Sequence, residues 1–394
     1  AMNSPVLARV RTEALAIKAP NSALAAPARP LSIFEFWPPF IFYAPVVLQW
    51  VVLAIRHRGT TLPALANPGI DGGGLCGESK TETFSLLGRE GRARLAPFTS
   101  LVTRNTNDTD GDFRRALAAM RSTGLTFPIV AKPDIGCRET GVFAIENRQK
   151  LAAYLHTFPR GARLILQCYV PDPGEAGVFY VRRPGETRGR ITSLTLKYFP
   201  TVTGDGVSTV AELIRADKRA GRVTALYFKQ LAPHLHLVPC LGEPFPLAFA
   251  GNHCKGAIFR NGNHLITAAM EARFDAIARE IPGYYFGRFD VRFADLDDFR
   301  RGDDFTIIEF NGAGSEATHI WDPETTLREA YRSLWQHFSM AFEIGAIHRA
   351  RGAKPLRLVD LWRRYRAQQK LIRGYPDRLS DGPPAPLKAP DTPL

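Results

Sequence analysis

The chain has 394 residues, of which 45% are hydrophobic, so it is long enough to bury a large core and to divide into two or three domains. It carries 51 lysines and arginines against 38 aspartates and glutamates, and its net charge of +13 should attract anions such as nucleotides, acidic substrates, nucleic acid or acidic lipid. The five cysteines include no Cys-x-x-Cys pair, which argues against a zinc site or a disulfide framework and favours a reducing, cytoplasmic compartment.

The first 58 residues change character at residue 31. Residues 1–30 are rich in alanine, proline and arginine and predict a flexible N-terminus without a secretory signal. Residues 31–58 are aromatic and aliphatic, and they end in a basic trio after a stretch whose only acid is Glu35. Prolines interrupt this segment and leave an apolar run of about ten residues, far short of the roughly 20 that a spanning helix needs. Attachment to the membrane interface is the preferred interpretation, and packing on the protein's own core or a dimer partner, or a true span, remain open.

The rest of an N-terminal region, predicted to extend over 31–110, contains the sequence GIDGGGLCGESK at 69–80. It lacks the residue order of a phosphate-binding P-loop, and no strand is evident before it. We therefore predict a turn-rich connection that leads into a short helix.

The segment 127–142 has the features of a phosphate-binding loop. A predicted strand at 127–131 delivers Lys132, and Pro133 ends the strand. Gly136 and Gly141 bound the loop that follows, where backbone amides can approach phosphate oxygens while the lysine supplies a positive charge. A helix at 147–157 and a strand at 163–170 should come next.

The stretch 285–319 is the most informative part of the chain. Two β-rich runs at 287–293 and 307–311 flank an acidic connection, which predicts a β-hairpin. Alternate residues of a strand share a face, so Arg288 and Asp290 project together, as do Glu309 and Asn311. Pairing the two strands would bring two carboxylates and an amide to one place, an oxygen donor set that suits Mg²⁺.

These segments together resemble the ATP-grasp superfamily. Five motifs follow one another along the chain: a strand with Lys-Pro and a glycine loop, QCYV before Glu175, GDG with Ser-Thr at 204–209, GRFD at 287–290 and IIEFN at 307–311. Their order is similar to that in carboxylate–amine ligases related to D-alanine–D-alanine ligase and to the ligase module of cyanophycin synthetase. Thr209 and Glu212 have the spacing of a capping box, which predicts that a helix starts there. The segment 251–259 looks like the family stretch that enters the active site. The resemblance covers about 110–325.

The resemblance implies a set of roles. Lys132, the loop from Gly136 to Gly141 and Lys197 would contact the phosphates of ATP, and Arg288 would stabilise the acylphosphate and the tetrahedral intermediate. The remaining implied ligands are Gln167, Tyr169 and Val170 for adenine, Glu175 for ribose, Asp290, Glu309 and Asn311 for Mg²⁺ or Mn²⁺, and His253 and Ser315 for substrate.

The predicted fold is an α/β (α+β) ATP-grasp fold in which two subdomains clamp ATP. Its central nucleotide-binding subdomain would span 111–200 and its catalytic subdomain 201–350, before a basic helix within 351–375 and a proline-rich, disordered tail at 376–394. Helices are expected at 264–280, 324–346 and 356–373. We favour packing of the last helix on the domain, through Leu358, Trp362 and Tyr365 among others, over contact with an acidic membrane.

The predicted function is ATP-dependent, ADP-forming ligation of a small-molecule carboxylate to an amine through an acylphosphate. Two alternatives are modification of a protein or peptide terminus by an amino acid, and a membrane-associated scaffold that binds nucleotide without turnover. The chain departs from the family in lacking a Rossmann-like N-terminal domain and in carrying GAGSE after Asn311, where relatives have Thr-x-Pro-Gly. D-Alanine is therefore not the expected substrate. The sequence contains no recognised nucleic-acid-binding module, so nucleic acid is not an expected partner. The expected location is the cytoplasm, with attachment to the inner membrane face as one option. Formation of a homodimer remains open.

Overall fold

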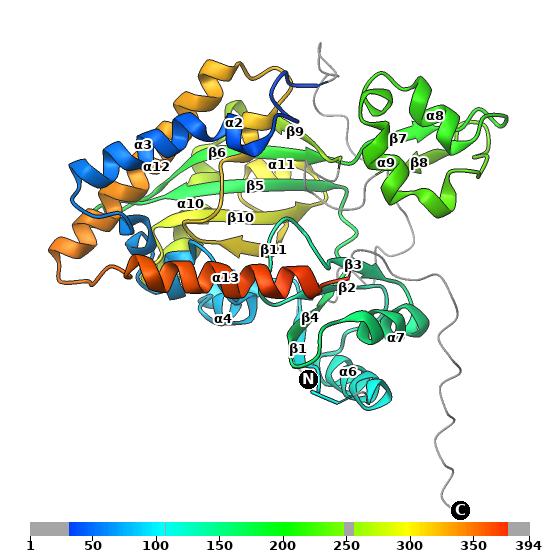
Figure 1. Cartoon of the computed structure of the whole chain (residues 1–394), viewed down its shortest axis with the longest axis horizontal. Helices are drawn as coiled ribbons and strands as arrows, with labels where there is room; N and C mark the ends of the chain where they lie inside the picture. Colours follow the sequence, from blue (N-terminus) through cyan, green and yellow to red (C-terminus); the bar gives the residue numbers. More distant parts are fainter. Residues whose placement is uncertain (1–30, 107, 248–255, 377–394) are drawn as a thin grey trace, which may run out of the picture. The chain divides into compact units, whose positions relative to one another are not determined.

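The computed structural model describes residues 31–376 except 107 and 248–255. The chain divides into two compact units (Figure 1). In the described part, the first unit contains Cys76–Pro171 and residues 359–376, and the second contains residues 31–75 and Asp172–Leu358.

The first unit is built on a four-stranded antiparallel sheet. Its strand order is β1-β4-β2-β3, with bounds Phe98–Val102 (β1), Arg163–Cys168 (β4), Ile129–Pro133 (β2) and Phe143–Ile145 (β3). One face of the sheet shares a core with helices α6 (Thr109–Thr123) and α7 (Arg148–Thr157). Two short helices, α4 (Lys80–Ser85) and α5 (Arg89–Arg94), precede β1.

Helix α13 (Leu358–Gly374) packs differently from the prediction. Leu371 and Ile372, near its C-terminal end, contact the core of the first unit. Trp362 and Tyr365 were expected to pack, but 57% and 50% of their surfaces are exposed. The prediction was wrong for these two residues because the apolar contact of this helix is confined to its last turns.

The second unit is built on a five-stranded antiparallel sheet in the order β11-β10-β5-β6-β9. The strands are Phe305–Asn311 (β11), Phe286–Phe293 (β10), Gly174–Val181 (β5), Arg190–Tyr198 (β6) and Ile258–Asn261 (β9). Helix α10 (Ala268–Glu280) covers one face through Phe274, whose ring contacts Phe289 and Phe305. At one end of the other face, Phe179 and Phe286 pack with helix α12 (Leu327–Ala350).

A small subdomain with its own core interrupts the second unit between β6 and β9. It contains strands β7 (Thr201–Thr203) and β8 (Pro244–Pro246) and helices α8 (Val210–Ala216) and α9 (Thr224–Gln230). The predicted capping box is confirmed, because Thr209 and Glu212 exchange side chain–backbone hydrogen bonds at the start of α8. Short 3-10 helices and one further helix complete the described chain: η1 (Leu62–Leu65), η2 (Asp71–Gly74), η3 (Ala220–Arg222), η4 (Ala232–His234), η6 (Asn263–Leu265), η7 (Thr318–Trp321) and α11 (Leu296–Arg300).

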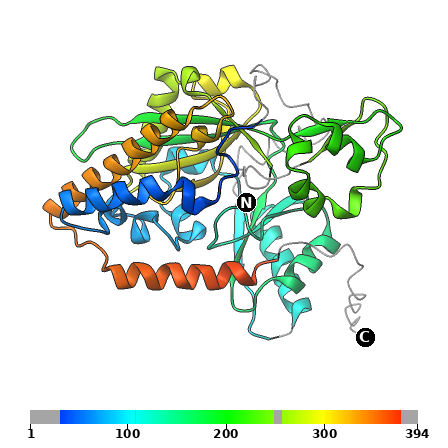
Figure 2. The same cartoon turned by 45° about the horizontal axis from the view of Figure 1, so that its top comes forward.

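Residues 31–58 form helices α2 (Pro39–Phe42) and α3 (Ala44–Arg56), which belong to the second unit. Figures 1 and 2 both show α3 running beside α12. Phe42 and Val46 pack into one core cluster with Leu334 of α12, and Leu53 packs into another with Phe342. Among the helices of the described residues, none combines the length and the apolar character needed to cross a bilayer.

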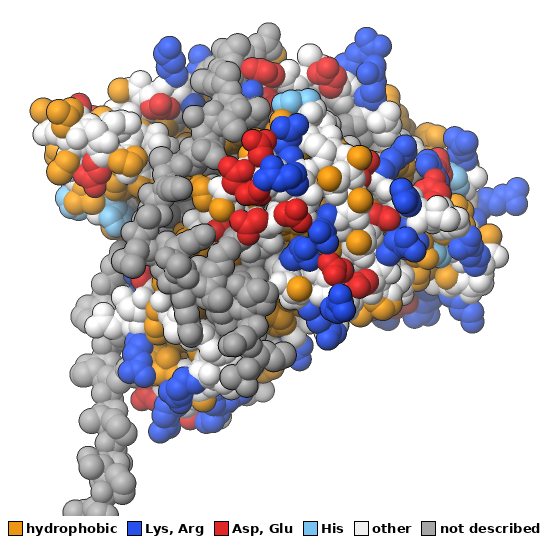
Figure 3. All heavy atoms as spheres, turned by 180° about the vertical axis from the view of Figure 1, so that it is seen from behind, with side chains coloured by type: hydrophobic (Ala, Val, Ile, Leu, Met, Phe, Trp, Pro, Cys, Tyr) orange, Lys and Arg blue, Asp and Glu red, His pale blue; other side chains and the backbone are white. Residues whose placement is uncertain are grey.

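The mixed α/β class and the hairpin of β10 and β11 are confirmed, and the predicted helices correspond to α10, α12 and α13. The grouping of the elements differs from the predicted division. Strands β5 and β6 fall within 111–200, yet they pair with β10 and β9 in the second unit. Sheet pairing joins strands that are far apart in sequence, which a division in chain order does not capture. Seen from behind, lysine, arginine and acidic side chains are interspersed over the surface (Figure 3).

Candidate active site

One end of the five-stranded sheet carries a charged face. The register places Asp290 opposite Glu309 on β11 and opposite Gly177 on β5, while Lys197 lies opposite Glu175. Since opposed residues share a face, as do residues two apart on a strand, the sheet gathers charged and amide side chains on one side. We call this set the charged face; it consists of Glu175, Lys197, Arg288, Asp290, Arg292, Glu309 and Asn311.

A β-bulge in β11 makes this arrangement possible. Asp290 pairs with Glu309, but the next residue, Val291, pairs with Ile307, which leaves Ile308 as the extra residue. On a regular strand Ile307 and Glu309 would point to the same side of the sheet. The bulge lets Ile307 enter the apolar core while Glu309 joins the charged face.

Asp290 lies at the centre of the charged face and is 5% exposed. Lys197 Nζ donates to its Oδ1 at 2.9 Å, and Arg288 donates to both oxygens at 3.0–3.2 Å. A Cβ at Gly177 would lie 3.0 Å from Cδ of Arg288, so glycine at that position leaves room for the guanidinium.

Glu175 lies inside the charged face and not on a connecting loop. It is buried on β5, where Lys197 donates to Oε1 at 3.0 Å and Arg292 pairs with Oε2 at 2.9 Å. Lys197 therefore bridges two buried carboxylates. The predicted contact of Glu175 with ribose stays a prediction, and sequence reasoning did not foresee its pairing with Lys197.

The electrostatics keep these groups ionised. Burial acts to raise the pKa of Asp290, but Arg288 and Lys197 outweigh it and lower that pKa to about 2. Burial acts to lower the pKa of Lys197, and Asp290 and Glu175 reverse the effect and raise it above its usual range. The pKa of Arg288 is raised in the same way, chiefly by Asp290 against the effect of burial.

Arg288 also connects the charged face to the segment that follows β11. Its Nη1 donates to the backbone oxygen of Glu316 at 2.9 Å. The Glu316 carboxylate accepts from the Tyr43 hydroxyl at 2.9 Å and from the Trp321 indole nitrogen at 3.0 Å. Tyr43 precedes α3, so the aromatic N-terminal segment supports the backbone that Arg288 contacts. Nothing in the local sequence around Tyr43 indicated this role.

Two buried histidines, His319 and His337, are neutral. The ring of His319 contacts the hydroxyls of Ser193 at 2.6 Å and Ser333 at 3.3 Å, and burial lowers its pKa to about 4. His337 packs between Phe179 and Phe286, with ring centroids 4.6 Å from each, and burial lowers its pKa to about 3. Both rings are uncharged at neutral pH, so they shape the site without adding charge.

Gly73 and Gly74 of the 69–80 segment form a wall beside the end of β11. The amide of Ala313 donates to the Gly73 carbonyl at 3.0 Å, and the amide of Gly314 donates to the Gly74 carbonyl at 2.6 Å. Gly73 has a φ of +66°, and a Cβ there would lie 2.3 Å from the Ala64 carbonyl oxygen. The segment predicted to be a turn-rich connection therefore pairs through its backbone with the residues that follow Asn311.

Ser315, a predicted substrate contact, is half-buried, and its hydroxyl donates to the Gly312 carbonyl at 2.6 Å. His253, the other predicted substrate contact, lies outside the described residues. On the charged side of β6, Thr195 lies opposite Gly177 and is fully buried. Among the described residues, its hydroxyl has no hydrogen-bond partner.

The donor set at the β10–β11 end fits a hard divalent cation. Asp290 and Glu309 face each other, and the Asn311 amide nitrogen donates to Asp290 Oδ2 at 3.3 Å. A half-turn of that amide would present its oxygen, and Mg²⁺ accepts such oxygens together with water and phosphate. Across the described residues, no group of three or more His, Cys, Asp or Glu side chains is arranged to hold a metal. An ion here would therefore depend on Asn311 and on substrate oxygens.

In the first unit, Lys132 and Gln167 lie on one face of the four-stranded sheet. Gln167 pairs in register with Val130, which is two residues from Lys132. Lys132 is 5% exposed and its Nζ lies 5.4 Å from the ring centroid of Phe84, while Gln167 donates to the Ala96 carbonyl at 3.2 Å. At the strand end that follows Gln167, Tyr169 is half-buried and Val170 is buried.

The loop after Lys132 is anchored at both ends by tyrosines. The Tyr375 hydroxyl donates to the Ile135 carbonyl at 2.6 Å, and the Tyr154 hydroxyl donates to the Gly141 carbonyl at 2.9 Å. Lys80, which sequence reasoning did not select, is 8% exposed and its Nζ lies 3.4 Å from the Gly136 carbonyl oxygen. A second buried lysine therefore contacts the predicted phosphate loop.

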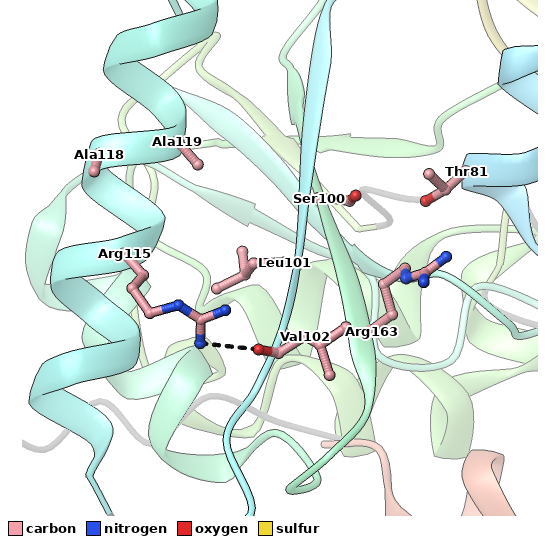
Figure 4. Close-up of a pocket in the computed structure, with 8 residues that line it drawn as sticks. All are labelled: Thr81, Ser100, Leu101, Val102, Arg115, Ala118, Ala119 and Arg163. Atoms are coloured by element: carbon pink, nitrogen blue, oxygen red, sulfur yellow. Dashed lines mark hydrogen bonds between the residues drawn. The ribbon is translucent and has the colours of Figure 1, made fainter.

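An open depression of about 630 Å³ lies elsewhere in the first unit, between edge strand β1 and α6 (Figure 4). Arg115 and Arg163 line it, and Arg115 donates to the Val102 carbonyl at 3.0 Å. It contains none of the residues predicted from the sequence.

Among known proteins, the chain shows similarity to solved structures. No family model matches the chain, and no curated relative matches it. The solved structures that it resembles include a D-alanine–D-alanine ligase, a D-cycloserine synthetase and a bifunctional glutathione synthetase.

Three of these structures illustrate the extent of the likeness. D-alanine–D-alanine ligase from Bacillus anthracis is 14% identical, with 72% of each chain covered and a TM-score of 0.39. D-cycloserine synthetase DcsG is 13% identical, covering 67% of this chain and 70% of that one at a TM-score of 0.35. For the bifunctional glutathione synthetase from Pasteurella multocida, the identity is 15%, the TM-score 0.32, and the chain spans only 36% of that protein's length. These TM-scores are too low to support an activity, which has to follow from the residues of this chain.

Proposed function

We propose that this protein is an ATP-dependent, ADP-forming ligase that joins a carboxylate to an amine through an acylphosphate. The observation that carries the proposal is the charged face. It holds buried Lys197 and Arg288 around Asp290, which faces Glu309 across the hairpin. Such a set of fixed charges suits phosphoryl transfer, where positioning and electrostatic stabilisation provide most of the rate enhancement.

The reaction has two displacement steps. An oxygen of the substrate carboxylate attacks the γ-phosphorus of ATP, the bond from that phosphorus to the bridging oxygen breaks, and ADP leaves. The amine nitrogen then attacks the acyl carbon, the carbon–oxygen bond to phosphate breaks, and the amine loses a proton as the amide forms. Neither step needs a nucleophilic side chain.

Arg288 is the proposed catalytic residue of the second unit. Its guanidinium, held in place by Asp290 and the Glu316 carbonyl, would stabilise negative charge on the acylphosphate and on the tetrahedral intermediate. Lys197 would contact phosphate oxygens, and among the described residues the Thr195 hydroxyl on the same face has no hydrogen-bond partner. Asp290, Glu309 and Asn311 would hold Mg²⁺ or Mn²⁺, which when bound neutralises phosphate charge.

The first unit is proposed to bind the nucleotide. Lys132 and the backbone amides of the loop from Gly136 to Gly141 would contact phosphates, with Lys80 as an added cation. Gln167, Tyr169 and Val170 of this unit are proposed for adenine, Glu175 of the second unit for ribose, and Ser315 and His253 for substrate.

The test is ADP and phosphate release from Mg-ATP against a mixed panel of carboxylates and amines, with hydroxylamine present to trap acylphosphate as a hydroxamate. Glu309→Gln should abolish substrate-dependent release and hydroxamate formation. Glu280→Gln on α10, which is exposed and outside the charged face, is the matched control and should retain both. ATP binding without turnover across the panel would favour the scaffold alternative, and an active Glu309→Gln variant would refute the proposed site.

A further inference from the structure

The segment 31–58 presents an apolar surface to solvent. On one side of α3 and at the end of α2, large hydrophobic side chains are between 49% and 77% exposed. We call this set the apolar surface; its most exposed members are Phe40, Val47, Leu48, Val51, Val52 and Ile55. Isolated exposed apolar residues are normal, but a contiguous set on one helix indicates an interaction site.

The apolar surface is held in a fixed orientation. Val46 and Leu53, on the other side of α3, are buried against the core shared with α12. The Gln49 side chain donates to the Trp335 carbonyl on α12 at 2.8 Å, and Trp335 itself is 45% exposed beside it. Helix α3 is therefore attached to the rest of the second unit along its inner side.

The exposed charged residues of the segment 31–58 are positive. Helix α3 contains no acid and ends at Arg56, Arg58 follows two residues later, and both arginines are exposed. The only acid of the segment, Glu35, is 5% exposed and pairs with Arg219 at 2.6 Å, so its charge is neutralised inside the protein.

We propose that the apolar surface binds the interface of an anionic phospholipid bilayer. The hydrophobic side chains would enter the boundary between headgroups and acyl chains, and Arg56 and Arg58 would contact lipid phosphates. The helix lies in the membrane plane, because its 13 residues extend about 20 Å while a bilayer core is about 30 Å thick, and its inner side is already packed on protein.

A second copy of the chain fits this surface less well than lipid does. A symmetric dimer would place the same surface on both partners. Since α3 itself carries a cation and no acid, two apposed copies of this helix would bring like charges together, whereas anionic headgroups supply the opposite charge.

The test is co-sedimentation of the full chain with vesicles of phosphatidylcholine alone and of phosphatidylcholine mixed equally with phosphatidylglycerol. The wild type should bind the mixed vesicles, and binding should weaken as salt is raised. Replacing Val47, Val51 and Ile55 together by glutamine should weaken partitioning by at least about 30-fold, since burial of each side chain in lipid is lost. Folding should be unaffected because all three side chains are already exposed in water.

Two matched variants separate lipid binding from other effects. Val207→Gln combined with Leu241→Gln changes two side chains that are each 82% exposed outside the segment, and binding should be unchanged. Arg56→Gln should weaken binding to the mixed vesicles only. Three results would each overturn the proposal. They are absence of vesicle binding by the wild type, equal vesicle binding by the triple variant, and conversion of a dimer to a monomer by the triple variant without any change in vesicle binding. These outcomes are independent of the ligase assay.

Discussion

Removal of the bridging ammonium, by Lys197→Met, tests the charged face most directly. Breaking a buried ion pair by deleting one partner costs about 3–5 kcal/mol, because a buried charge is left unpaired. Here the two carboxylates that lose Lys197 each retain another cation. Asp290 keeps Arg288 at 3.0 Å, and Glu175 keeps Arg292 at 2.9 Å. We therefore expect a loss at the lower end, about 3 kcal/mol in the free energy of unfolding at pH 7.

The loss should depend on pH in a defined direction. The folded-state pKa of Asp290 is depressed to about 2, so its ionised form adds stability above the unfolded-state pKa, and that stability is lost as the pH falls through the folded value. When Lys197 is removed, the pKa of Asp290 is less depressed, and ionised Asp290 therefore contributes less to the free energy of unfolding. The difference between variant and wild type should be largest above about pH 5 and should shrink toward pH 2.

Urea unfolding followed by tryptophan fluorescence measures this effect. Trp37, Trp50, Trp321 and Trp335 lie in the second unit and Trp362 in the first, so a Trp362→Phe background reports on the second unit alone. Lys218→Met, at an exposed position, is the matched control and should change stability by less than about 0.5 kcal/mol. A loss below about 1 kcal/mol for Lys197→Met, or one that does not change with pH, would refute the reasoning.

Three further substitutions test individual contacts. Gly177→Ala would place a methyl group 3.0 Å from Arg288 Cδ and should slow ligation at least about tenfold by displacing the guanidinium, with a smaller loss of stability; unchanged kcat would contradict this. His337 is buried and neutral, and its pKa is lowered to about 3, so its stabilising contribution is present above pH 6.5 and is lost as the pH falls toward 3. His337→Phe should therefore reduce the loss of unfolding free energy between pH 7 and pH 5 by up to about 2 kcal/mol. An equal pH dependence of stability in both proteins would exclude this contribution of His337. Tyr43→Phe removes a 2.9 Å hydrogen bond to Glu316 and should cost about 1 kcal/mol in urea unfolding, whereas an unchanged midpoint would show that the bond is not stabilising.

Short-range signals in the sequence determined several elements of this protein. The alternation of side chains around Asp290 and Glu309 predicted both strands, their pairing and the shared face. The motif of Thr209 and Glu212 predicted a helix start, because a capping box depends on residues three apart. Lys132 was correctly placed near the end of a strand because proline follows it.

The tertiary structure alone decided the composition of the charged face. Glu175 and Lys197 are 22 residues apart, and only the pairing of β5 with β6 places them opposite each other beside β10. The glycines near Gly73 appeared to be a simple connection, yet they form the wall beside the end of β11 through backbone hydrogen bonds that no side-chain pattern encodes. Periodicity reports which side of an element is buried, but the identity of the partner depends on long-range packing. The sequence therefore determined the strands and their faces, and the fold determined which charges meet.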